Sequence, residues 1–326
     1  MKKVSVIIPV YNVERFVDRC VESLMGQTLK DGIEYIFVDD ASTDSSMKIV
    51  HEVVSRYPEH ANQVMYLTHA ENKGLPAARN TGLTAAQGEF VFHCDSDDFI
   101  EPEMLEEMLA AAERESADMV YCDFMLSFDQ NERYMSQRSY TLGREALTGM
   151  LAGVIKYNVW NKLIRRSLYN GIKFPEGKSM GEDMTIIKVV SRANRVCHLP
   201  KAYYHYIRMN GEAMTQRYSE KKLSDLRENT ADTIKYLETH VQDDRISQEI
   251  NWFKLNVKLP FLFTGDKADI RRWREWYPEA NKEILSNKNL VARTRALQWC
   301  AANHLGMINR IYNYLLLKIV YGKIYK

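Results

Sequence analysis

The chain has 326 residues, of which 45% are hydrophobic and 27% are charged, and its formal net charge is +1. This length accommodates one large domain with a smaller attachment, and the composition is typical of a soluble globular protein. A nearly neutral chain creates no overall field that would attract nucleic acid, so we expect no nucleic-acid partner.

Cysteine usage and hydropathy indicate where the protein works. The five cysteines lack the paired spacing of a disulfide framework or a zinc site, which favours a reducing compartment. The apolar run at residues 4–8 is interrupted by Pro9 and then by charged residues, too early for a signal peptide. No stretch reaches the ~18 uncharged apolar residues that a bilayer-spanning helix needs. We therefore expect a cytoplasmic protein.

The first 125 residues alternate short β-branched runs with apolar residues at helical spacing. The expected strands cover residues 4–9, 33–38, 64–67, 90–94 and 119–122. Helices are expected between them, and glycine and proline mark their limits. Gly26 ends the first helix, Pro76 begins the third, Gly88 ends it, and Pro102 begins the fourth.

This alternation predicts right-handed crossovers and an α/β fold with a mainly parallel sheet and helices on both faces. Ligands of such sheets bind beyond the carboxyl ends of the strands. Three expected strands end in polar residues, namely Tyr11-Asn12, Asp39-Asp40 and Asp95-Ser96-Asp97-Asp98. The sequence therefore predicts a site at one edge of the sheet.

The pattern changes after residue 125. Residues 130–140 are polar and irregular, which indicates a loop or an antiparallel excursion. Gly181 precedes a helix with an apolar stripe, and helical patterns dominate from about residue 218 to the end. We expect a catalytic domain at 1–217, divided into halves at 1–125 and 126–217, and a helical C-terminal region at 218–326.

The segment Asp95-Ser96-Asp97-Asp98 carries the strongest chemical signal. Clustered carboxylates repel one another, and a divalent cation would offset that repulsion. One or two carboxylates can hold such an ion while phosphate oxygens fill its other positions. A solvated acidic turn that caps the next helix is an equally weighted interpretation.

Other charged residues have both a functional and a structural interpretation. A carboxylate at Asp39-Asp40 can bind a nucleobase or ribose, or serve as a cap. Glycine-rich phosphate loops are absent from the sequence, so Lys73 and Arg79 are candidates for phosphate contacts, or are solvated cations. The acidic pair after Gly181 can supply a general base, or can stabilise the first turn of a helix.

Five segments together resemble family 2 glycosyltransferases of the GT-A fold. They are residues 4–12, 38–44, 72–82 and 95–98 with Gly181-Glu182-Asp183, and they keep the family's order and spacing over roughly the first two-thirds of the chain. The resemblance implies a Rossmann-like GT-A domain and a metal-dependent enzyme. One segment alone is a weak signal, but all five in register are specific.

The resemblance also implies roles for individual residues. The positions expected at the nucleotide sugar are Pro9, Tyr11, Asn12, Asp40, Lys73, Arg79, Asp95 and Ser96. Lys73 is included because it is a candidate for phosphate contacts. Asp40 matches the carboxylate that binds uracil, and Asp97 or Asp98 would bind Mn²⁺ or Mg²⁺, with the spacing from Asp95 favouring Asp97. Asp183 matches the catalytic base of inverting members, with Glu182 beside it.

The implied activity is inverting transfer of a sugar from a UDP-sugar to a saccharide or lipid-linked saccharide, in surface polysaccharide synthesis. Two alternatives stay open. One is a sugar-nucleotide nucleotidyltransferase, which normally needs a glycine-rich basic loop after the first strand. The other is a non-catalytic protein that binds nucleotide sugars, which the aspartate cluster together with Asp183 disfavours.

Two aromatic segments have weaker signals. The segment Trp160-Asn161-Lys162 could form part of an acceptor wall, although a buried tryptophan is the commoner case. The segment 203–208 resembles the family's closing strand, where His205 or Arg208 would touch the diphosphate. A core strand with a hydrogen-bonded histidine is the favoured interpretation.

Residues 288–326 contain basic side chains and no acidic ones. Their apolar residues at helical spacing are Ile308, Ile311, Tyr312, Leu315, Leu316, Ile319 and Val320. A basic amphipathic helix can lie on an anionic membrane, or it can pack on the catalytic domain or on a second subunit. We expect peripheral contact with the inner face of the membrane, and an oligomer stays open.

Overall fold

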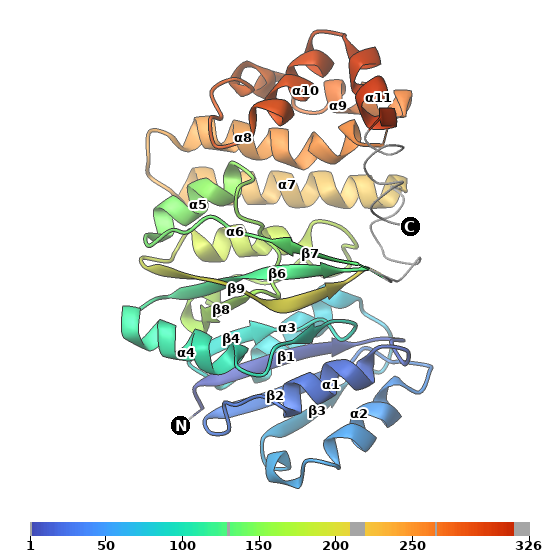
Figure 1. The fold of residues 1–326 in the computed structure, drawn as a ribbon, viewed down its shortest axis with the longest axis vertical. Coiled ribbons are helices and arrows are strands. Elements are labelled where there is room, and N and C mark those ends of the chain that lie inside the picture. Colours follow the sequence, from blue (N-terminus) through green and yellow to red (C-terminus); the bar gives the residue numbers. More distant parts are fainter. Residues whose placement is uncertain (1, 129–130, 209–218, 265, 316–326) are drawn as a thin grey trace. The chain divides into compact units, whose positions relative to one another are not determined.

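The computed structural model describes residues 2–128, 131–208, 219–264 and 266–315. The chain forms two compact units (Figure 1). The first consists of Met1–Glu145 and Tyr157–Asn229, and the second of Ala146–Lys156 and Thr230–Lys326. The domain limits expected from the sequence, 1–217 and 218–326, stay a prediction.

One mixed sheet forms the centre of the first unit. In spatial order its strands are β3 (Val64–Thr68), β2 (Ile33–Asp39), β1 (Val4–Val10), β4 (Phe90–His93), β8 (Lys162–Arg165), β6 (Met119–Ser127), β9 (Val196–Ile207) and β5 (Phe99–Ile100). Strands β3 to β4 are parallel, as are β6 and β9, whereas β8 and β5 pair antiparallel with their neighbours. The expected excursion at 130–140 contains β7 (Glu132–Met135), antiparallel to β6.

Helices cover both faces of the sheet. The helices of the first half are α1 (Val17–Met25), α2 (Ser46–Val54), α3 (Leu75–Ala85) and α4 (Met104–Glu115), with the short η1 (Pro58–His60) after α2. Apolar side chains of α1, α2 and α4 share one core with β1, including Val6 and Ile8. Helix α3 contacts β1 and β2 from the other face, where Gly82 lies against Ile7.

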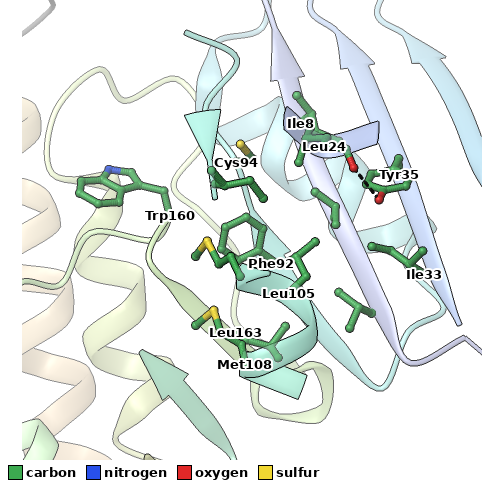
Figure 2. Close-up of a cluster of buried hydrophobic side chains, with 14 of the residues drawn as sticks. Ile8, Leu24, Ile33, Tyr35, Phe92, Cys94, Leu105, Met108, Trp160 and Leu163 are labelled. Carbon is green, nitrogen blue, oxygen red and sulfur yellow. Dashed lines mark hydrogen bonds between the residues drawn. The ribbon is translucent and has the colours of Figure 1, made fainter. Parts of the chain in front are cut away.

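Figure 2 shows the core beneath α1 and α4. Leu24 and Leu105 point from these helices towards Phe92 of β4, and the Tyr35 hydroxyl donates a hydrogen bond to the Leu24 carbonyl at 2.8 Å. Trp160 belongs to the same apolar cluster. This cluster packs α1 and α4 against the parallel half of the sheet.

Two limits expected from glycine and proline differ from the structure. Helix α3 ends at Ala85, before Gly88, and α4 begins at Met104 rather than at Pro102. Gly88 instead lies so close to β1 that a Cβ atom there would be 2.6 Å from the Ser5 nitrogen. This glycine is needed for close approach of two backbones, and not to stop a helix.

The segment after Gly181 is shorter than a regular helix. It forms η3 (Glu182–Met184), a single 3₁₀ turn, followed by the six-residue α6 (Thr185–Val190). The four residues of the expected apolar stripe are all buried: Met184, Ile187, Val190 and Ala193. Another 3₁₀ turn, η2 (Arg166–Tyr169), follows β8.

The second unit is helical. It contains α8 (Ile246–Lys258), η4 (Leu259–Leu262), α9 (Lys267–Glu275), η5 (Pro278–Glu283), α10 (Ala292–Ala302) and α11 (Gly306–Leu315), while α5 (Gly143–Leu151) and α7 (Glu220–His240) each continue from the first unit into the second. The expected helical C-terminal region is thus confirmed. Among the described residues, no helix has the length and apolar character needed to cross a membrane. Leu316, Ile319 and Val320 lie outside the described residues.

Candidate functional site

The carboxyl ends of β1, β2 and β4 meet at one edge of the sheet, because β1 pairs in parallel with both neighbours. Pro9 is buried near the end of β1, and Tyr11 beyond it is 45% exposed. Asn12 has a left-handed backbone (φ 50°), and its Oδ1 accepts a hydrogen bond from the Thr43 amide at 2.9 Å. The turns after β1 and β2 are therefore hydrogen-bonded to each other.

Asp40 is buried and fully hydrogen-bonded. Its Oδ2 accepts from the Gly74 amide at 2.7 Å, and its Oδ1 accepts from the Lys73 amide at 2.9 Å and lies 2.6 Å from His69 Nδ1. The Lys73 side chain itself is exposed. Asp40 thus holds the loop that leads into α3.

Asp39 is the less committed carboxylate of this pair. Its Oδ1 accepts from the Ser42 amide at 2.8 Å, and within the described residues its second oxygen has no hydrogen-bond partner. It is also more exposed than Asp40. The sequence gives two adjacent carboxylates at this strand end. Only the hydrogen bonds to the loop before α3 show that Asp40 is the one with a structural role.

We expect Asp40→Asn to lower the free energy of unfolding by about 1–3 kcal/mol, because an amide NH₂ would face backbone donors. Urea denaturation measures this change. Asp39→Asn is the matched control, and its stability should stay close to that of the wild type. Loss of UDP binding in Asp40→Asn with unchanged stability would instead support direct contact between Asp40 and the uracil ring.

Arg79 is an almost completely buried cation behind the aspartate cluster. It is 1% exposed, and its Nη2 donates to Asp95 Oδ1 at 2.9 Å. Burial alone would lower the pKa of Arg79, but the charges of Asp95, Asp183 and Glu182 raise it overall. Its Nε and Nη1 have no hydrogen-bond partner among the described residues. Arg79 therefore brings positive charge to this cluster of carboxylates, as a phosphate-binding site requires.

The neighbouring residues Asp97 and Asp98 differ in their surroundings. Asp98 is 1% exposed, and its two oxygens accept from the Ile207 amide at 2.8 Å and the Tyr204 hydroxyl at 2.7 Å. Asp97 is half-buried, and no other described residue hydrogen-bonds its carboxylate. Burial and the charge of Asp95 raise the pKa of Asp97 to about 6. Asp98 therefore ties the β4–β5 turn to β9, and Asp97 is the carboxylate left available.

The donor set fits a cation shared with a ligand. Within the described parts of the chain, no three acidic, histidine or cysteine residues converge into a site that could hold a metal ion. Asp95 is engaged by Arg79, and Ser96 is buried beside it. A Mg²⁺- or Mn²⁺-type ion typically takes one or two carboxylates and fills its other positions with phosphate oxygens and water. Asp97, with Asp95 beside it, matches that requirement.

Asp183 is half-buried, and its surroundings disfavour the charge of its carboxylate. Its Oδ1 is buried with no hydrogen-bond partner in the described structure. Burial, followed by the charge of Glu182, raises the pKa of Asp183 to about 8, against the opposing effects of Arg79 and Lys162. A carboxyl group with such a pKa can take up a proton near neutral pH.

The structure brings several of the expected site residues together. The charges of Asp95, Asp183 and Glu182 act on Arg79, and that of Arg79 acts on Asp97. Asp40 lies outside this group, since its contacts are with His69 and the loop before α3. The cluster thus joins a strand end, a helix and a 3₁₀ turn that are far apart in the sequence.

Sequence analysis gave no role of their own to two residues of this region, Lys162 and His93. Lys162 is buried, its Nζ donates to the Asn158 carbonyl at 2.6 Å, and burial lowers its pKa to about 7. His93 is 1% exposed between the rings of Tyr169 and Phe174, and burial and the charge of Arg79 lower its pKa. An ionisable residue next to an apolar run was the available signal for both.

In the two aromatic segments, the tryptophan is buried in the core and the histidine is hydrogen-bonded on a strand. Trp160 is 7% exposed and stacks on Tyr204 with ring centroids 4.4 Å apart, within the core cluster that Figure 2 shows. His205 lies on β9 with its Nε2 2.7 Å from Glu101 Oε1. Arg208 is exposed at the end of the described segment.

Comparison with known proteins agrees with this arrangement. The family model described as "Glycosyl transferase family 2" matches residues 5–190. The putative glycosyltransferase EpsH of Bacillus subtilis is 35% identical over 228 residues, which are 67% of this chain and 64% of EpsH. The poly(ribitol-phosphate) β-N-acetylglucosaminyltransferase TarS of Staphylococcus aureus is 32% identical over 223 residues, covering 67% of this chain and 38% of TarS.

A solved structure shares the fold over nearly the whole chain. The crystal structure of S. aureus TarS 1–349 in complex with UDP-GlcNAc has a TM-score of 0.67 and 24% sequence identity, and the match covers 98% of this chain and 92% of that one. This likeness confirms the expected GT-A fold. The sequence matches to EpsH and TarS span 64% and 38% of those proteins' own lengths, less than two-thirds in each case. Because the family model covers more than half of the residues, the chain belongs to glycosyl transferase family 2.

Proposed function

We propose that the protein is an inverting glycosyltransferase that moves a sugar from a UDP-sugar to a hydroxyl group of a saccharide or lipid-linked saccharide. Surface polysaccharide synthesis is the process in which we place it. Membership of glycosyl transferase family 2 supports the reaction class. The observation that carries the proposal is the half-buried Asp183, whose buried Oδ1 has no hydrogen-bond partner among the described residues, and whose pKa responds to the nearby charges of Arg79 and Asp95.

Asp183 acts as the general base in this proposal. It accepts the proton of the acceptor hydroxyl while that oxygen forms a bond to the anomeric carbon and the bond to the diphosphate breaks. A pKa of about 8 makes the carboxylate a stronger base than an exposed aspartate, at the cost of a smaller ionised fraction at neutral pH. One displacement inverts the anomeric centre, so no covalent sugar–enzyme intermediate is needed.

Arg79 and the aspartate segment act on the leaving diphosphate. Arg79 has two nitrogens without partners among the described residues, and its side chain cannot lose its charge at any working pH. Asp97, together with Asp95, would hold Mn²⁺ or Mg²⁺, which neutralises negative charge on the diphosphate when bound. Removing one such electrostatic contact typically costs ~10²–10³-fold in turnover.

The choice of donor and location rests on relatives and chemistry. TarS has been crystallised with UDP-GlcNAc and with UDP, which supports a uridine nucleotide for this chain as well. The five cysteines form no disulfide, as expected in the reducing cytoplasm, where we place the enzyme.

A panel of UDP-sugars with Mn²⁺ tests this proposal through UDP release, with and without a saccharide acceptor. We expect slow release from one donor alone and faster release with a matching acceptor. Formation of a sugar nucleotide with release of pyrophosphate would indicate a nucleotidyltransferase instead. Tight UDP binding with no release under any condition would indicate a non-catalytic protein.

A further inference from the structure

Helix α11 places polar residues against its own unit. Asn309 and Asn313 lie one turn apart and are 0% and 2% exposed. The Asn309 Nδ2 donates to the carbonyl of Leu297 in α10 at 3.0 Å, and the Asn313 Nδ2 donates to the carbonyl of Leu262 in η4. Because breaking hydrogen bonds of buried amides is costly, these two contacts fix which side of α11 faces inward.

The other side of α11 is apolar and exposed. We call it the outward face, and its residues with their exposed fractions are Met307 (71%), Ile308 (48%), Ile311 (53%), Tyr314 (57%) and Leu315 (47%). A surface helix normally has the reverse arrangement, with apolar residues inward. Rotating α11 to bury this face would break both asparagine contacts. A contiguous exposed apolar surface of this kind marks an interaction site.

The start of α11 is equally constrained. Gly306 lies so near α9 that a Cβ atom there would be 3.1 Å from Ile270 Cγ2. Helices α10 and α11 are in contact within the second unit. The outward face is therefore held on a packed support.

Charge indicates what the outward face binds. The sequence from residue 284 to 326 contains no acidic residue, and its basic residues are Lys288, Arg293, Arg295, Arg310, Lys318, Lys323 and Lys326. Arg310 is exposed on α11 itself, and the Arg293 guanidinium lies 5.9 Å from the ring centre of Tyr312. Two copies meeting through this face would bring like charges together, whereas anionic lipid headgroups would complement them.

We propose that the outward face of α11 docks on an anionic lipid bilayer. The helix lies in the plane of the headgroups, its apolar side chains enter the boundary with the acyl chains, and nearby arginines contact lipid phosphates. This inference is independent of sugar transfer, because it concerns binding in the absence of donor and acceptor.

Co-sedimentation of the full chain with vesicles tests the proposal. We expect binding to vesicles of phosphatidylcholine and phosphatidylglycerol in equal parts, and much weaker binding to phosphatidylcholine alone. The triple variant Ile308→Gln, Ile311→Gln, Leu315→Gln should have at least about tenfold lower affinity for the vesicles. It lacks three apolar side chains whose transfer from water into the bilayer favours binding. Arg310→Gln should bind the anionic vesicles about fivefold less.

Leu142→Gln and Leu285→Gln are the matched controls, because both leucines are at least 50% exposed and lie outside α11. They should bind vesicles like the wild type, and circular dichroism should show all variants folded. Equal vesicle binding by the triple variant and the wild type would overturn the proposal. So would a wild-type dimer that ignores vesicles and becomes a monomer in the triple variant, since a second copy would then cover the face.

Discussion

Asp183→Asn is expected to lower kcat/KM by ~10²–10⁴-fold, the usual contribution of a general base, while UDP binds as it does to the wild type. The asparagine keeps the shape of the side chain but cannot accept the acceptor's proton. Stopped assays of product formation measure the first quantity, and titration calorimetry with UDP measures the second. Normal turnover in this variant would remove Asp183 from the role of base.

The same substitution should stabilise the metal-free protein above neutral pH. The pKa of Asp183 is raised from 3.8 to about 8 on folding, so between these values the folded state holds a proton that the unfolded state has lost. Stability contributed by this group therefore falls as pH rises from about 4 to about 8. Thermal melting of Asp183→Asn should exceed that of the wild type at pH 8 and converge with it near pH 4.

Glu182→Gln serves as the control for this experiment. The charge of Glu182 helps to raise the pKa of Asp183, so its removal should lower that pKa and keep turnover. The acid limb of the pH–rate profile should then shift to lower pH, by about one unit for a neighbouring like charge. An unchanged profile would show that Glu182 does not act on the base.

Asp97→Asn is expected to reduce turnover by about 10²–10³-fold and to weaken Mn²⁺ binding, because it removes the uncommitted carboxylate of the cluster. The fold should not suffer, since no other described residue hydrogen-bonds the Asp97 carboxylate, and burial and the charge of Asp95 raise its pKa, which makes its charge unfavourable in the metal-free protein. A chelator should abolish wild-type turnover, and Mn²⁺ or Mg²⁺ should restore it.

Asp98→Asn is the matched variant, and we expect it to lose activity because the fold is destabilised rather than because metal binding is lost. Its carboxylate accepts from the Ile207 amide and the Tyr204 hydroxyl, so an amide there should destabilise the fold by about 1–3 kcal/mol. Thermal melting and Mn²⁺ titration together separate the two variants. If Asp97→Asn kept its activity, and Asp98→Asn were stable but did not bind Mn²⁺, then Asp98 rather than Asp97 would be the metal ligand.

Much of the fold was predictable because its first strands consist mostly of apolar residues. Strands β1, β2 and β4 are buried on both faces, and Val, Ile and Phe make up most of their residues, as such burial requires. Strand β8 escaped prediction because its four residues begin and end with Lys162 and Arg165. Strand β5 has only two residues, Phe99 and Ile100, too few for any periodicity.

The chemistry of the site was predictable by segment, but not by individual residue. The sequence located Asp97 and Asp98 at a strand end, and their separate roles depend on Tyr204 and Ile207, more than a hundred residues later. The contacts of Asp40 depend in the same way on how the loop at Lys73 folds back. Local patterns cannot encode such pairings, because the register of β9 against the β4–β5 turn is a property of the whole sheet.

The crossing of the chain between its two units limits how relatives can be recombined. Residues 146–156 leave the first unit, and their backbone is fastened within the second, where Asn256 Nδ2 donates to the Leu151 carbonyl and Asn287 Nδ2 to that of Ala152. A chain that ended at Asn229 would keep residues 146–156 but would lose the hydrogen-bond partners and apolar contacts that this stretch has in the second unit. A chimaera that exchanges the helical region must therefore graft two separate stretches, and a single crossover point cannot deliver an intact hybrid.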